Sequence, residues 1–188
     1  MNIKIRKLSA ALLEDYLHFF DEHEDCYCVC YSGDNHAGKD FRKKETRREH
    51  AAKFVVSGMI QGYLAYSDNQ VVGWCNANNR NKCLQCEGWQ VMLSSVDIAE
   101  SDADVKIKSV FCFTIAPVFR RKGISAQLLG QVCADAAKDG YDCVEAYPNK
   151  AFIDTFQDHM GPLDLYKNFG FEPHSETENK IVMRKHFK

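Results

Sequence analysis

The amino-acid sequence predicts one α/β domain built on a mixed β-sheet, in the α+β manner. Two β-rich runs are joined by the short polar break Ser67-Asp68-Asn69, which is a hairpin signal. Later in the chain a strand, a helix and another strand follow one another, which predicts one parallel β-α-β unit with a right-handed crossover. Because a doubly wound parallel sheet would not contain the hairpin, the expected sheet combines antiparallel and parallel pairs.

The bulk composition is that of an ordinary globular domain. The chain has 188 residues, of which 45% are hydrophobic and 27% charged, so residues 1–188 are expected to form a single domain. A net charge of −2 and a pI near 6.4 give no indication of a general nucleic-acid binder, which would show a high pI. The sequence shows neither the apolar core of a signal peptide nor an apolar run of bilayer length. The expectation is a cytoplasmic protein that binds neither nucleic acid nor membranes.

The elements follow from periodicity and from breaker residues. Alternating polar and apolar residues predict a first strand at 2–7, and Ser9 is expected to cap a helix. A second helix is expected from about Asp40 to Val56, after a loop at 24–38. Residues 76–103 give no clear pattern. The other expected elements are strands at 61–66, 70–75 and 105–115, a helix at 123–138, a strand at 143–147, a helix at 163–169, and final strands at 171–173 and 180–185.

The segment Arg120-Arg121-Lys122-Gly123-Ile124-Ser125 lies between an apolar strand, which Pro117 ends, and an amphipathic helix. The first N–H groups of a helix lack partners and carry a partial positive charge, so they form a phosphate site. Gly123 allows close backbone approach, Ser125 can donate a hydroxyl, and the three cations attract an anion. The alternative is a basic turn that starts an ordinary surface helix, since such motifs are weak alone. The strand before it and the helix after it favour the phosphate site.

The stretch from Phe113 to Ser125 resembles the acetyl-CoA-binding motif of GNAT N-acetyltransferases, Gln/Arg-x-x-Gly-x-Gly/Ala. Arg120 and Gly123 match that motif, and Ser125 replaces the final small residue. The stretch 165–171 resembles the second signature of the family, a Tyr three residues ahead of Gly-Phe. Stretches 144–148 and 161–163 are similar to a poorly characterised bacterial subgroup. The strand pattern from 2 to 186 is compatible, so the resemblance covers nearly the whole chain.

The resemblance implies a central, mostly antiparallel sheet with one splayed parallel pair and with helices on both faces. The pantetheine arm of acetyl-CoA would lie in the splayed gap and pair with the backbone of Phe113 and Ile115. The acetyl group would pass directly to an amine of a small molecule or peptide in a ternary complex, without a metal. The cofactor-binding residues so implied are Phe113, Thr114, Ile115, Arg120, Arg121, Lys122, Gly123, Ile124 and Ser125.

The same resemblance implies catalytic roles. An N–H near Phe113 or Ile115 would stabilise the negative charge that builds on the thioester oxygen. Tyr166 occupies the position of the general acid that protonates the departing thiolate; otherwise it is an aromatic packing residue. Glu145 is expected on the strand that lines the cleft, where it could act as base directly or through water, orient a cationic substrate, or be a solvated charge. His159 could contact CoA or lie in a surface loop.

Nine cysteines are an odd number without an export signal, so most are expected to be thiols. The pattern Cys26-x-Cys28-x-Cys30 with Cys83-x-x-Cys86 could bind zinc, but its spacing is imperfect, and we prefer an acceptor-pocket lining shared with Tyr27 and Tyr31. A non-catalytic acyl-CoA-binding protein, or a thiol or metal sensor, is the alternative function. A homodimer is left open. The cysteines expected as small core hydrophobes are Cys75, Cys112, Cys133 and Cys143.

Overall fold

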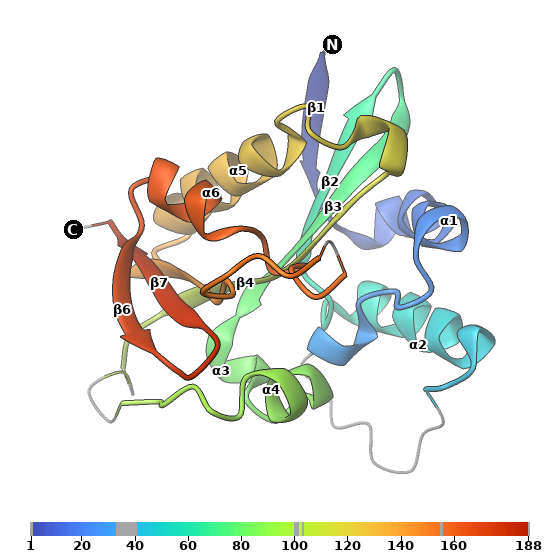
Figure 1. Ribbon diagram of the computed structural model, residues 1–188. Coiled ribbons are helices and arrows are strands. Elements are labelled where there is room, and N and C mark those ends of the chain that lie inside the picture. Colours follow the sequence, from blue (N-terminus) through green and yellow to red (C-terminus); the bar gives the residue numbers. More distant parts are fainter. Residues whose placement is uncertain (1, 33–40, 100–101, 103, 155, 188) are drawn as a thin grey trace.

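Seven strands form a single sheet in the order β1-β2-β3-β4-β5-β7-β6 (Figure 1). The structure is a computed structural model and describes residues 2–32, 41–99, 102, 104–154 and 156–187. Every neighbouring pair of strands is antiparallel except β4 (Ile107–Ile115) and β5 (Cys143–Ala146), which are parallel. The predicted mixed sheet with one parallel pair is therefore confirmed.

The remaining elements follow the expected chain order closely. The other strands are β1 (Ile3–Lys7), β2 (Gly62–Ser67), β3 (Gln70–Asn79), β6 (Glu172–Glu176) and β7 (Ile181–His186). The helices are α1 (Leu13–His23), α2 (Lys44–Ser57), α3 (Arg80–Cys83), α4 (Glu87–Met92), α5 (Ile124–Lys138) and α6 (Leu163–Asn168), with 3-10 turns η1 (Ala10–Leu12), η2 (Val29–Tyr31) and η4 (Pro117–Phe119).

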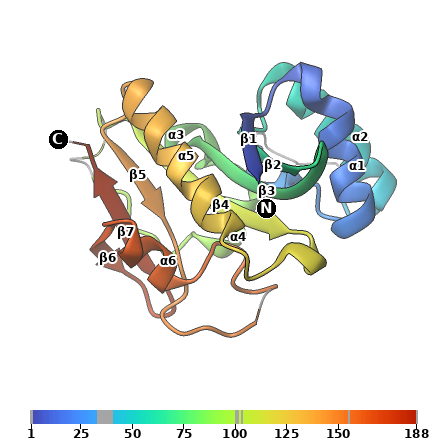
Figure 2. The same ribbon diagram turned by 90° about the horizontal axis from the view of Figure 1, so that it is seen from above.

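The helices cover both faces of the sheet, as predicted (Figure 2). Because side chains alternate along a strand, neighbouring residues of β2 point to opposite faces. Leu64 and Tyr66 pack in a core cluster with residues of α1 and α2. Tyr63 and Ala65 pack in a second cluster with residues of α5. The hairpin between β2 and β3 turns through Asp68 and Asn69, both at positive φ, as a type I′ turn requires.

Strands β4 and β5 separate towards their carboxyl ends. Their pairing runs only from Ile107–Cys143 to Val110–Ala146, whereas β4 continues to Ile115. The register between β3 and β4 shifts at the same place, because Asn76 pairs with Cys112 but Ala77 with Val110. This β-bulge and the splayed pair open one edge of β4, and bulges often occur beside active sites.

Several predicted boundaries were wrong for local reasons. Ser9 makes no side-chain cap, and η1 precedes α1. The second helix begins at Lys44; residue 40, its predicted start, lies outside the described residues. Strand β3 continues to Asn79, and its buried residues Asn76 and Asn78 donate their side-chain N–H groups to Cys28 Sγ and to the Met59 carbonyl. Residues 76–103 therefore hold the end of β3 and the short helices α3 and α4.

Candidate active site

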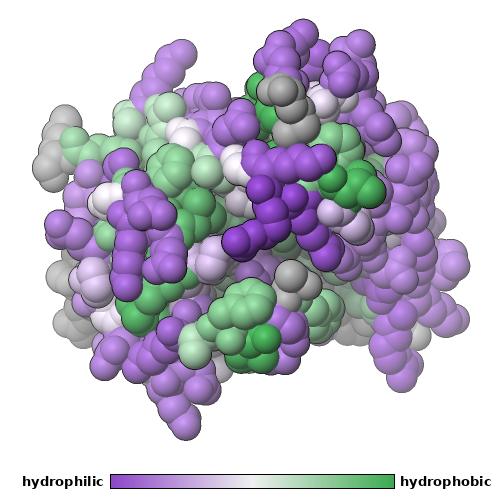
Figure 3. All heavy atoms as spheres, turned by 45° about the horizontal axis from the view of Figure 1, so that its top comes forward, coloured by the Kyte–Doolittle hydropathy of each residue, from purple (hydrophilic) through white to green (hydrophobic). Residues whose placement is uncertain are grey.

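A cavity of about 580 Å³ opens where β4 leaves β5, and this volume is in the range of small-ligand sites. Its walls come from the end of β4, the turn into α5, the loop after α1 and the segment before α6. The surface in Figure 3 is mainly hydrophilic, with hydrophobic residues exposed in separate groups. Phe152 and Phe156, which are largely exposed, belong to the cavity wall.

The turn into α5 has the geometry of an anion site. Gly123 caps the helix at φ 75°, and Arg121 also has positive φ. The first intrahelical bond reaches from Gln127 N–H to the Gly123 carbonyl, so the three earlier N–H groups have no partner within the helix. The residues that carry them, Ile124, Ser125 and Ala126, line the cavity. Backbone donors and the positive end of a 15-residue helix therefore face the same space.

The side chains of the turn take different directions. Arg120 and Arg121 line the cavity, and Arg120 Nε donates to the Ile115 carbonyl at 3.2 Å. Lys122 does not line the cavity, since its Nζ lies over the Phe119 ring, 5.1 Å from the centroid. The structure thus brings together the predicted residues Phe113, Thr114, Ile115, Arg120, Arg121, Gly123, Ile124 and Ser125, and leaves Lys122 outside.

The free edge of β4 faces the segment before α6. The N–H of Phe113 donates to the His159 carbonyl at 2.6 Å. Because backbone groups alternate along a strand, the N–H of Ile115 points to this same side, away from β3. The His159 ring lines the cavity, and burial lowers its pKa, which favours the neutral ring. The backbone groups that the sequence indicated are therefore at the cavity, but the Phe113 N–H already has a partner.

Tyr166 lies just below the cavity floor. Its side chain is fully buried, and its hydroxyl donates to the Met160 carbonyl. Gly161 lines the cavity at φ 89°, and an added Cβ there would lie 3.1 Å from the Tyr166 hydroxyl and 3.1 Å from the Phe113 ring. Burial raises the pKa of Tyr166 well above its ordinary value, so the phenol keeps its proton. The Tyr166 hydroxyl therefore lies against Gly161, a residue of the cavity wall that has no side chain.

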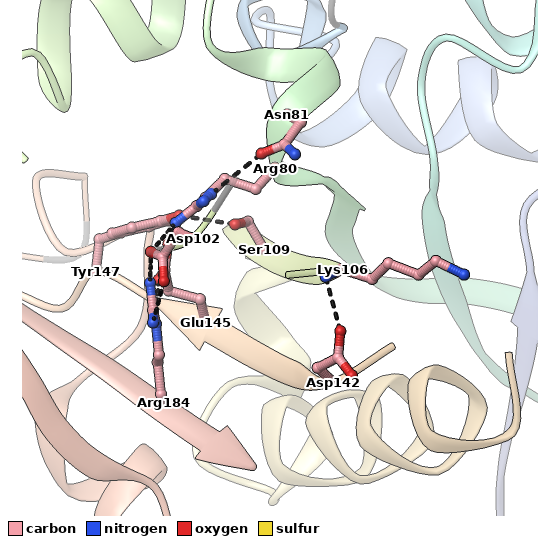
Figure 4. A network of polar contacts seen from close by, with 9 residues as sticks. All are labelled: Arg80, Asn81, Asp102, Lys106, Ser109, Asp142, Glu145, Tyr147 and Arg184. Atoms are coloured by element: carbon pink, nitrogen blue, oxygen red, sulfur yellow. Dashed lines mark hydrogen bonds and ion pairs between the residues drawn. The ribbon is translucent and has the colours of Figure 1, made fainter. Parts of the chain in front are cut away.

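Glu145 is not where the sequence analysis expected it. It is 1% exposed and does not line the cavity; one oxygen accepts from Arg184 Nε at 2.6 Å and the other from the Tyr147 hydroxyl at 2.5 Å (Figure 4). Arg80 lies 3.7 Å from the same carboxylate, and Asp102 bridges the two arginines. The expected position at the cleft is therefore wrong, because the side chain points into a buried ionic network between β5, β7 and α3.

The cysteine-rich loop after α1 forms the wall opposite the α5 turn. Cys26, Cys28, Cys30 and Tyr31 line the cavity, as predicted, and Cys112 of β4 joins them. Tyr27 does not, because its hydroxyl donates to Asp21. All nine cysteines are free thiols, and Cys75, Cys112, Cys133 and Cys143 are buried.

Other wall residues were missed by the sequence reasoning: Glu24, Met92, Phe152, Phe156, Asp158, Gly161 and Leu165. Aromatic residues inside the polar segment 148–161 were the available signal. Within the described part of the chain, no group of three or more His, Cys, Asp and Glu is arranged to hold a metal ion. No described helix has the length and apolarity to cross a bilayer.

The family model described as acetyltransferase (GNAT) family matches residues 16–171. This range is most of the chain and includes both the α5 turn and Tyr166. The chain belongs to the GNAT acetyltransferase family. A comparison with curated proteins finds no match.

Solved structures of other GNAT proteins share the fold at low identity. PaiA N-acetyltransferase of Thermoplasma acidophilum, in complex with coenzyme A, is 17% identical with a TM-score of 0.57 over 100% of both chains. A GNAT acetyltransferase of Streptococcus pneumoniae is 14% identical with a TM-score of 0.55, also over 100% of both chains. A Drosophila melanogaster polyamine N-acetyltransferase is 13% identical with a TM-score of 0.56, over 99% of this chain and 100% of the other. At this identity the likeness establishes the GNAT fold alone.

Proposed function

We propose that this GNAT protein transfers an acetyl group from acetyl-CoA to an amine of a small molecule or peptide, by direct attack in a ternary complex. The observation that carries the proposal is the start of α5, whose backbone donors open into a cavity next to the free edge of β4. Gly123 supports close approach of a diphosphate, since an added Cβ there would meet no atom and its φ of 75° favours glycine.

The CoA half of the site would use the turn and the strand. The N–H groups at 124–126, with Arg120 and Arg121, would hold the diphosphate. The backbone of Phe113 and Ile115 would pair with the pantetheine arm and stabilise the thioester oxygen. For Phe113 to do so, its N–H must first release the His159 carbonyl.

Tyr166 would supply the proton for the CoA sulfur. When the amine nitrogen attacks the thioester carbonyl carbon, the carbon–sulfur bond breaks and the thiolate leaves. The buried phenol keeps its proton until that charge develops, and it lies against the cavity wall at Gly161. To reach the sulfur, its O–H must first release the Met160 carbonyl, to which it donates. The amine would approach from the wall formed by Cys26, Cys28, Cys30 and Tyr31.

Three measurements test the proposal. Calorimetry with coenzyme A should detect binding, and acetyl-CoA should raise the melting temperature. A thiol-release assay with acetyl-CoA should then find an acceptor in a panel of aminoglycosides, polyamines, amino acids and peptides. No heat with coenzyme A would remove the proposal. Binding without acetyl transfer to any class of amine would replace it with a non-catalytic acyl-CoA-binding protein.

A further inference from the structure

Cys28 is held in an unusual position on the cavity wall. Cys28 is only 1% exposed, yet it is one of the residues that line the cavity. Tyr27 and Cys28 both have positive φ, 45° and 50°, which non-glycine residues adopt rarely. The Tyr16 hydroxyl of α1 donates to the Tyr27 carbonyl at 2.5 Å and fixes this turn. The loop therefore directs Cys28 onto the sheet.

The sheet below Cys28 presents a group of adjacent side chains. Trp74 and Asn76 are two residues apart on β3 and so point to the same face. The register pairs Trp74 with Thr114 and Asn76 with Cys112, which places all four on that face. Cys28, Trp74 and Cys112 belong to one buried cluster. Cys28 thus meets the sheet one residue from Phe113, beside the β-bulge.

One hydrogen-bond donor binds the Cys28 sulfur, and a second, unpartnered donor lies in the same buried cluster. Asn76 Nδ2 donates to Sγ at 3.3 Å. The Trp74 indole N–H has no hydrogen-bond partner among the described residues, although the side chain is fully buried, and such a group costs about 1–3 kcal/mol. A thiol is a weak acceptor, whereas a thiolate accepts several strong bonds. These donors fit an ionised sulfur better than a protonated one.

The pKa shifts agree with that geometry. The Cys112 thiol, then Trp74 and Asn76, lower the pKa of Cys28 against the opposing effect of burial. Burial raises the pKa of Cys30 well above its ordinary value. The neighbouring Cys28, and then burial, raise the pKa of Cys112 well above its ordinary value. The Cys28 thiol is therefore the one that this cluster favours in ionised form.

Charged and titratable groups from several elements surround Cys28 and influence its ionisation. Burial raises the pKa values of Tyr16 of α1 and Tyr31 of η2, so both stay neutral. Cys86, before α4, opposes the ionisation of Cys28. The pKa of Cys83 in α3 is raised by its hydrogen bond to Cys86. Glu24, Asp158, His159, Arg120 and Arg121 line the same cavity, and Cys75 of β3 interacts electrostatically with Cys28.

We propose that Cys28 is the general base of the transfer, with Asn76 and Trp74 as its positioning residues. This inference rests on the proposed function. As the amine nitrogen forms its bond to the acetyl carbon, its N–H proton passes to the Cys28 thiolate and forms an S–H bond. The carbon–sulfur bond of the thioester breaks, and Tyr166 gives its proton to the CoA sulfur. Transfer of the Cys28 proton through solvent to the Tyr166 phenolate restores both groups. Cys28 thereby fills the role of base at the cavity wall, which Glu145 does not reach.

The ionisation of Cys28 is tested without any turnover. The pH dependence of iodoacetamide alkylation, resolved by peptide mass spectrometry, should show Cys28 half-reactive below about pH 8.5, the ordinary thiol value. Asn76→Ala removes one donor and should shift that midpoint upward. Asn78→Ala removes a buried amide whose partner is the Met59 carbonyl, and should leave it unchanged. A Cys28 midpoint at or above 8.5 would overturn the inference.

Kinetics with the best amine of the panel test the role. Cys28→Ala and Cys28→Ser should lower kcat about a hundredfold or more, the usual scale for a lost general base. The acid limb of kcat/KM should match the alkylation midpoint and move upward in Asn76→Ala. Cys133→Ala, on α5 and outside the cavity, should keep wild-type turnover. Retained turnover in Cys28→Ala would overturn the base role but leave the proposed function. If incubation with acetyl-CoA alone left one acetyl group on Cys28, Cys28 would act as a nucleophile, and its role as general base would be overturned.

Discussion

The N–H of Phe113 and the carbonyl oxygen of His159 are joined by a 2.6 Å hydrogen bond across the space between the splayed strands. The segment before α6 thus takes the place of a neighbouring strand on the open edge of β4. Asp158 holds this segment in shape, since its carboxylate accepts from the N–H groups of Ile153 and Asp154. A ligand that pairs with β4 must compete with this arrangement.

Coenzyme A is therefore expected to loosen residues 152–161 while it orders the α5 turn. Hydrogen–deuterium exchange should increase in peptides covering 152–161, because a segment released from β4 opens its own N–H bonds to Asp158 more often. Exchange should decrease in peptides covering 123–127, because the N–H groups at the start of α5 gain partners. Protection at 123–127 with unchanged exchange at 152–161 would mean that Ile115, and not Phe113, makes the strand contact.

Ser125→Asp should affect stability and binding in opposite directions. A carboxylate in the first turn of α5 interacts favourably with the helix dipole by about 0.3–1 kcal/mol, so the melting temperature should be kept or raised. The same charge should repel a diphosphate and weaken coenzyme A binding about tenfold or more in calorimetry. Ser125→Ala separates the loss of the hydroxyl from the added charge. Equal affinity in wild type and Ser125→Asp would contradict the diphosphate position.

Tyr166→Phe should lower kcat about a hundredfold or more, because the variant keeps the ring packing but loses the proton donor. The lost hydrogen bond to the Met160 carbonyl should cost only about 1 kcal/mol of stability. Tyr147→Phe is the matched control, since that phenol is also fully buried but donates to Glu145 outside the cavity. A comparable loss of kcat in both variants, or wild-type turnover in Tyr166→Phe, would remove the acid role.

The sequence predicts local and periodic features of this protein well. The hairpin at Asp68 and Asn69 and the strand–turn–helix around Gly123 are encoded by neighbouring residues, and both are present. Contacts between distant segments are not so encoded. The position of Glu145 on its strand predicts a cleft residue. Its side chain instead points away from the cleft because it is paired with Arg184, 39 positions later in the chain. The donors around Cys28 likewise depend on the register of β3 and β4. They also depend on the left-handed turn at Tyr27 and Cys28, which contains no glycine from which it could be predicted.

Glu145→Gln separates a structural role from a catalytic one. Neutralising this carboxylate leaves Arg184 and Arg80 short of a buried counter-charge, so stability should fall by about 3 kcal/mol or more. Turnover per folded molecule and the pH dependence of kcat/KM should remain those of the wild type, because the carboxylate does not reach the cavity. Denaturant unfolding and a pH–rate profile measure the two effects, and loss of the acid limb would return Glu145 to the role of base.

Asp102 should make the stability of the protein sensitive to acid. Hydrogen bonds from Arg184 and then Arg80 lower the pKa of Asp102 to about 2, whereas an aspartate in the unfolded chain titrates near 3.9. A depressed pKa stabilises the fold above the unfolded value, and that contribution is lost as the pH falls from about 4 through 2. Asp102→Asn should lower stability at neutral pH and flatten this acid dependence. Parallel stability curves for wild type and Asp102→Asn between pH 5 and 2 would mean that the buried arginines find other partners.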